Sequence, residues 1–183
     1  MLTKWLRENK AAAVLLTFLR LYVGWEWLTA GWHKITGAKP FDATGFLTNA
    51  IAKPIADTAT HEAVYPTFVA FLKAFALPNV KLFNLLIPWG ELLVGIGLIL
   101  GVLTTTAMFF GLLMNFMYMF AGTVSTNPWL TLLGIILITA GANAGRFGVA
   151  YYVKPYVHHL VNVFKHHDHG HGRGGDKHHP AHA

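Results

Sequence analysis

The sequence predicts an all-α integral membrane protein, a four-helix bundle with one long connection between its first and second helices. Three observations lead to this fold. Hydrophobic residues make up 54% of the 183-residue chain and charged residues only 12%, which is about half the charged share of a soluble domain. Four apolar runs approach the roughly 20 residues that a membrane-spanning helix needs. One long stretch, punctuated by prolines, separates the first run from the second.

The four expected spans are residues 11–32, 82–103, 105–124 and 129–144. Residues 39–80 form the long connection, in which Thr60 is expected to cap a short amphipathic helix over residues 61–76 because apolar residues recur there near helical spacing. The resulting domain division is a membrane domain over residues 1–153 and a polar, histidine-rich, largely disordered cytoplasmic tail over residues 154–183.

The basic residues indicate how the chain lies in the membrane. Lys4, Arg7 and Lys10 precede the first run, and Arg146 and Lys154 follow the last. An even number of spans with positive flanks predicts that both termini lie in the cytoplasm, in a multi-pass protein of the plasma membrane. The formal charge of +6 is therefore attributed to basic residues that orient the helices in the membrane, and it does not indicate nucleic-acid binding. Arg20 interrupts the first run, so we interpret this run as a retained helix and not as a cleaved signal peptide.

Three charged residues within the apolar runs are the first candidates for a functional site. Arg20 and Glu26 lie in the first run and Glu91 in the second. A charge at the centre of a bilayer costs roughly 2.5–3.5 kcal/mol on insertion scales, so such groups are expected to be paired, hydrated or used. We predict that Glu91 forms a core site with Arg20, and that Glu26 belongs to a path from the outer surface. An ion pair that only fixes the helix register is the structural alternative.

Polar and aromatic residues on the other expected helices extend this site. Helical spacing places Asn115 and Tyr118 on one face of the third span, and Asn143 on the inner face of the fourth. Trp27 and Trp89 lie beside the charged residues, where either could stack on a planar ring, although tryptophans in spanning helices more often mark the membrane interface. An interhelical hydrogen bond is the structural alternative for Asn115 and Tyr118.

Two further sets of residues are candidates for binding. His33 and Lys34, at the outer end of the first span, could attract an anionic substrate. Nine of the eleven histidines lie between His158 and His182, and such tracts bind zinc, nickel or copper, although without a fixed scaffold this indicates only nonspecific binding. The densest part of the tract contains His166, His167, His169 and His171.

A quinone is the cofactor that these residues fit best. The chain contains no cysteine, which excludes cysteine-ligated iron–sulfur clusters and c-type haem attachment within it. A buried b-type haem would need histidines at membrane depth, whereas His33 and His61 lie near the ends of their segments. Quinone carbonyls accept hydrogen bonds from Arg, Tyr or Trp, the ring stacks on aromatic side chains, and a carboxylate can relay its protons.

Four ordered motifs resemble those of the DoxX/DoxD family. They are LRLYVGWEWLTAGWHK ending at Lys34, PWGELLVG from Pro88, MNFMYMFAGTVSTNP from Met114, and AGANAGRFG from Ala140. The resemblance covers residues 15–150 and implies a four-helix fold. In the DoxD branch it implies the membrane subunit of a thiosulfate:quinone oxidoreductase that works with a second, smaller subunit. It also implies a shared core containing Arg20, Glu26, Lys34, Glu91, Asn115, Tyr118, Asn143 and Arg146.

Three functions are compatible with the sequence. The leading hypothesis is a quinone-linked oxidoreductase subunit that passes electrons from thiosulfate or a similar donor to the quinone pool. In this hypothesis Glu26, Glu91 and Arg20 are catalytic, and His33 and Lys34 bind the donor. The second is a noncatalytic accessory or assembly subunit of a respiratory or redox complex. The third is a carrier for a small molecule or ion. Besides the bilayer, the expected partner is a second subunit, such a complex or another copy of the chain.

Overall fold

The computed structural model describes residues 1–149 and 151–153, and this part of the chain is helical. The helices are α1 (Leu2–Glu8), α2 (Lys10–Thr36), α3 (Thr44–Ala52), α4 (Pro66–Phe71), the π-helix η1 (Leu72–Ala76), α5 (Val80–Leu100), α6 (Thr104–Phe120), α7 (Asn127–Ala140) and the 3-10 helix η2 (Gly141–Gly145). In the described residues the only β-type pairing is an isolated bridge between Ala56 and Ala63.

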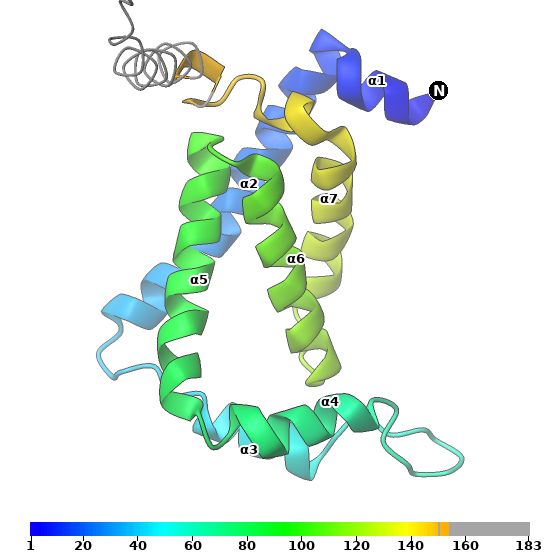
Figure 1. The fold of residues 1–183 in the computed structure, drawn as a ribbon, viewed down its shortest axis with the longest axis vertical. Coiled ribbons are helices and arrows are strands. Elements are labelled where there is room, and N and C mark those ends of the chain that lie inside the picture. The colour runs from blue at the N-terminus through cyan, green and yellow to red at the C-terminus, as the bar shows by residue number, and fades with distance from the viewer. Residues whose placement is uncertain (150, 154–183) are drawn as a thin grey trace, which may run out of the picture.

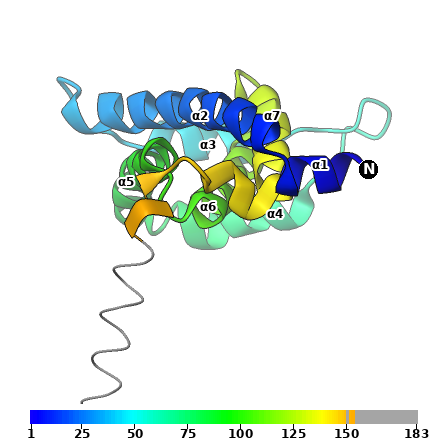
Figure 2. The same cartoon turned by 90° about the horizontal axis from the view of Figure 1, so that it is seen from above.

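Three helical segments are long and apolar enough to cross a membrane: Lys10–Thr36, Val80–Leu100 and Asn127–Gly145. They correspond to the first, second and fourth expected spans, and their length and composition indicate an α-helical membrane protein. The third expected span is α6, which is apolar but has only 17 residues. In Figure 1, α2, α5, α6 and α7 run side by side, while α3 and α4 lie across the end opposite α1. Figure 2 views the same helices from above.

Glycines bring the backbones of α2 and α5 into direct contact. A Cβ atom on Gly31 would lie 2.4 Å from the backbone nitrogen of Leu92, and a Cβ on Gly95 would lie 2.4 Å from the backbone nitrogen of Leu28. No side chain fits at such distances, so only glycine permits this approach. Small residues serve the same purpose in membrane helices generally, because lipid supplies no hydrophobic force to drive helices together.

The two helices are antiparallel, and the glycine contacts fix their register. Gly24 on α2 faces Leu98 on α5, while Gly31, farther along α2, faces Leu92. The middle of α2 therefore lies beside the end of α5, and the last turns of α2 lie beside the middle of α5. A tight turn at Gly101, in the left-handed conformation with φ 68°, then returns the chain into α6.

The connection between α2 and α5 differs from the sequence prediction. The expected helix over residues 61–76 begins only at Pro66, with Tyr65 and not Thr60 at its N-cap, because proline is favoured in the first turn, where its missing N–H costs nothing. The short helices α1 and α3 were not predicted. Within the connection, Leu72 and Ala76 pack with Leu47 and Ala50 of α3 in a second apolar cluster, while Phe71 and Phe75 remain exposed.

Candidate functional site

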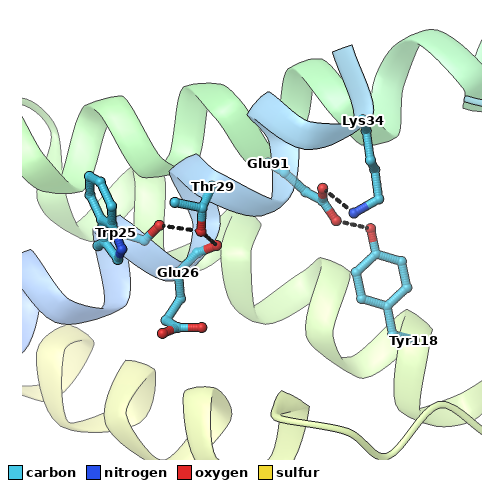
Figure 3. Close-up of polar contacts among 6 residues, drawn as sticks. All are labelled: Trp25, Glu26, Thr29, Lys34, Glu91 and Tyr118. Carbon is cyan, nitrogen blue, oxygen red and sulfur yellow. Dashed lines mark hydrogen bonds and ion pairs between the residues drawn. The ribbon is translucent and has the colours of Figure 1, made fainter. Parts of the chain in front are cut away.

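Glu91 is the centre of a polar cluster that joins three helices. Its Oε2 lies 2.6 Å from Nζ of Lys34 on α2, and its Oε1 accepts a hydrogen bond of 2.7 Å from the hydroxyl of Tyr118 on α6. Figure 3 shows the three side chains converging from their separate helices. The Glu91 side chain is only 3% exposed, whereas that of Lys34 is 30% exposed.

The sequence places these groups by simple means. Lys34 lies in the last turn of α2, where a cation is favoured by the helix dipole, and its flexible stem lets the ammonium group reach the middle of α5. The ammonium group also lies 5.9 Å from the centre of the Phe41 ring, a cation–π distance. Both oxygens of the buried Glu91 carboxylate thus have a partner, as a buried charge requires.

The cluster lines a cavity of about 340 Å³, a volume at the lower end of the range for small-molecule sites. Helices α2, α5 and α6 contribute to its wall, as does the loop between α6 and α7 through Thr123, Ser125 and Thr126. Phe41 and Phe46 from the α2–α3 connection and α3 also line it. These loop and aromatic residues were not predicted as part of the site, because only the fold brings them to the charged cluster.

Two buried residues of the cavity wall have polar atoms without a partner. Asn115 is fully buried, and neither its amide nitrogen nor its amide oxygen is hydrogen-bonded within the described residues. Trp27 is 3% exposed, and its indole Nε1 has no hydrogen-bond partner among the described residues either. Leaving a buried polar group unsatisfied costs about 1–3 kcal/mol. Both residues line the cavity, although the unpartnered atoms themselves are enclosed by protein.

Glu26 also lines the cavity, but it is separate from the Glu91 cluster. Its residue is half-buried, and its carboxylate has no hydrogen bond or ion pair among residues 1–149 and 151–153. The Thr29 hydroxyl donates hydrogen bonds to the backbone carbonyls of Trp25 and Glu26, as Figure 3 shows, and not to the Glu26 carboxylate. The two glutamates predicted from the sequence therefore face one cavity, one of them fully paired and the other without a partner.

The expected partnership of Arg20 with Glu91 is not found. The Arg20 guanidinium donates to the backbone carbonyl of Leu98 and, at 3.3 Å, to that of Ile99, at the end of α5. Arg20 thus satisfies carbonyls that a helix C-terminus leaves without internal partners. The antiparallel register explains the difference, because it places Arg20, in the middle of α2, at the end of α5 and brings Lys34, not Arg20, to Glu91.

Three other candidate residues lie away from the cavity wall. His33 and Trp89 are exposed. Asn143 is buried near the start of the chain, where its amide donates to the backbone carbonyls of Leu6 and Asn9. Asn143 thereby anchors α1 to η2. Neither His33 nor Asn143 is positioned to contact a ligand held at Glu91.

The metal-binding hypothesis concerns residues that the structure does not describe. His166, His167, His169 and His171 are not among the described residues. Within residues 1–149 and 151–153, no group of three or more His, Cys, Asp or Glu side chains is arranged to hold a metal ion. The candidate site of the described chain is thus the cavity that carries Lys34, Glu91, Tyr118, Asn115 and Trp27.

Comparison with known proteins identifies the family. Neither the curated proteins nor the solved structures yield a match. The family model described as DoxX matches residues 15–124, which is more than half of the 183 residues. The matched range includes Lys34, Glu91, Asn115 and Tyr118 and ends before the fourth motif at Ala140. The chain therefore belongs to the DoxX family of membrane proteins.

Proposed function

We propose that this protein is the quinone-binding membrane subunit of an oxidoreductase, with the quinone ring held in the cavity beside Glu91. One observation carries the proposal: a cavity among apolar helices combines a fully paired carboxylate with two buried, unpartnered hydrogen-bonding residues, Asn115 and Trp27. Quinone carbonyls are hydrogen-bond acceptors, and the Asn115 amide nitrogen and Trp27 Nε1 are donors. Both atoms are enclosed by protein in this structure, so in our proposal the two side chains turn toward the ring when it binds.

The polar cluster has the chemistry to handle the protons of the reaction. Reduction of a quinone to a quinol consumes two electrons and two protons. In our proposal Glu91 exchanges protons at the ring, while Lys34 and Tyr118 hold its carboxylate in place. Glu26, on the same cavity and without a partner, is the second proton-carrying group. General acids and bases of this kind must lie within hydrogen-bonding reach of the atoms they serve.

The electrons would come from outside this chain. The printed sequence has no cysteine, so an iron–sulfur cluster on the electron path would be held by another polypeptide. A partner subunit that oxidises thiosulfate or a similar donor is therefore part of the proposal. Because His33 lies away from the cavity and Lys34 is paired with Glu91, we assign the oxidation of the donor to that partner and not to these two residues.

The proposed arrangement in the plasma membrane has four crossings. It includes α6 together with the three longer segments, so that α1 and the chain after η2 lie on the cytoplasmic side. The segment from α3 to η1 then lies on the outer side, where the exposed Phe71 of α4 and Phe75 of η1 would rest in the interface as an amphipathic element.

Quinone titration of the purified protein tests the function. A short-chain quinone should quench tryptophan fluorescence saturably, because Trp27 lines the cavity. Asn115→Leu should raise the dissociation constant about tenfold, the equivalent of one lost hydrogen bond of about 1.4 kcal/mol. Glu62→Gln, in the exposed connection, should leave the constant unchanged.

The competing functions give different results. Saturable binding together with thiosulfate-dependent quinone reduction in membranes, lost on deletion of the gene, supports the enzyme subunit. A folded protein that shows no saturable quinone binding, and that co-purifies with a respiratory complex, would instead identify an accessory subunit. Uptake of a solute into proteoliposomes without quinone binding would identify a carrier.

A further inference from the structure

The Glu91 cavity adjoins an apolar groove. This first groove has a volume of about 310 Å³ and shares three wall residues with the cavity, namely Phe46, Ile87 and Tyr118. The Phe46 and Tyr118 rings meet edge to face, with their centres 6.3 Å apart, at the boundary between the two spaces. Tyr118 therefore presents its hydroxyl to Glu91 and its ring to the groove.

A second apolar groove extends the first along α5 and α6. It has a volume of about 550 Å³ and shares Leu86, Leu113 and Met114 with the first groove. Its lining continues along α5 to Leu100. At 1.5 Å per residue, the path from Leu86 to Leu100 is about 21 Å long. We call these two connected grooves the α5–α6 seam.

The seam faces outward, toward the lipid. Leu86 is 52% exposed and Leu113 is 43% exposed, although both are large apolar residues. The cavity at its end contains one lysine and two carboxyl groups, so it offers no net positive charge to a phosphate headgroup. A phospholipid therefore fits the connected spaces poorly. A neutral polar ring with a long apolar tail fits both parts.

We propose that the ligand is an isoprenoid quinone whose ring occupies the Glu91 cavity and whose tail lies in the α5–α6 seam. This inference rests on the proposed function and adds the position of the tail and the route of access. The ring reaches Glu91 sideways from the bilayer, past Phe46 and Tyr118. One residue of extended polypeptide contains three chain bonds and spans about 3.3–3.6 Å. An isoprene unit contains four chain bonds, so its extended length is somewhat greater than that of one residue. The seam therefore accommodates about four units.

Photo-crosslinking locates the tail directly. Quinones that carry a photoreactive diazirine on the first, second or fourth isoprene unit are added to the full-length protein in nanodiscs. After illumination, the labelled peptides are mapped by mass spectrometry. We expect the label to move from the region of Ile87 toward that of Leu100 as the diazirine moves outward. An excess of unlabelled isoprenoid quinone should abolish this labelling.

A pair of matched variants tests the seam itself. Leu113→Trp narrows the junction of the two grooves from an exposed position, and it should lower labelling beyond this point about fivefold. Leu132→Trp makes the same exchange on α7, at a residue that is 52% exposed and outside the seam, and it should leave the labelling pattern unchanged. Binding of a tail-less quinone, measured by fluorescence quenching, should be the same in both variants.

Each other outcome contradicts the inference in a distinguishable way. Labelling spread over all lipid-facing helices and resistant to unlabelled quinone would show only bulk lipid contact. The tail-less quinone could bind saturably while the diazirine labels appear on α2 or α7 and are abolished by unlabelled quinone. That result would overturn the placement of the tail in the seam but leave the proposed function intact. Absence of saturable binding by every quinone would overturn both.

Discussion

Lys34 and Glu91 are 57 positions apart in the chain, yet their charged atoms lie 2.6 Å from each other. The pair joins the last turn of α2 to the middle of α5, and the Tyr118 hydroxyl completes it from α6. The ammonium group compensates a carboxylate that is almost fully removed from solvent.

Removing the ammonium group should destabilise the protein more than removing both charges. Lys34→Met leaves Glu91 buried without a counterion, which typically costs about 3–5 kcal/mol. Adding Glu91→Gln should restore part of this loss. Thermal unfolding of the detergent-solubilised protein measures both effects, with Lys39→Met in the exposed connection as control. Equal midpoints for Lys34→Met and the double variant would show that the pair carries no such coupling.

The close approach of α2 and α5 should depend on glycine at two positions. Gly31→Val or Gly95→Val would place Cβ within about 2.4 Å of backbone atoms on the facing helix, so the helices must separate and the folded yield should fall sharply. Gly45→Ala is the control, because a Cβ there meets nothing within 4 Å. Size-exclusion profiles and protease resistance report the outcome. Native-like behaviour of both valine variants would contradict the contact.

Arg20 should support the fold and leave ligand binding unaffected. Arg20→Met removes the hydrogen bonds to the Leu98 and Ile99 carbonyls, with an expected cost of about 1–3 kcal/mol. The dissociation constant of a short-chain quinone should stay within about twofold, since Arg20 does not line the cavity. A much larger loss of affinity, in a variant whose unfolding temperature equals that of the wild type, would show that Arg20 belongs to the binding site.

The connection before α3 should loosen in acid. Hydrogen bonds from the Thr44 hydroxyl and backbone N–H, and from the Asn84 amide, lower the pKa of Asp42 below its ordinary value. A depressed pKa means that this stabilisation is present above about pH 4 and is lost as the pH falls through the folded-state pKa. Limited proteolysis of the connection should therefore accelerate below about pH 4. Asp42→Asn should flatten this pH dependence, and an unchanged profile would exclude Asp42 as its cause.

Composition and periodicity predicted the long helices well, because a span must be apolar over most of its length. They did not predict α3, whose nine residues are too few for a clear period. The pairing of Glu91 could not be deduced either. Arg20 and Lys34 share a face of α2 but are separated by about 21 Å along its axis. Only the register with α5 decides which cation meets the carboxylate, and that register depends on backbone contacts at Gly31 and Gly95.

The glycine contacts also distinguish how the helices around the cavity are held together. Between α2 and α5, backbone meets backbone, so neither helix can turn about its axis without a collision. Helix α6 meets the pair through side chains instead: a Cβ on Gly111 would face side-chain atoms of Val94 on α5 and Trp27 on α2. Side chains can change rotamer where main chains cannot. Main-chain contacts thus fix the helix pair that carries Lys34 and Glu91, whereas side chains hold α6 and its Tyr118 against that pair.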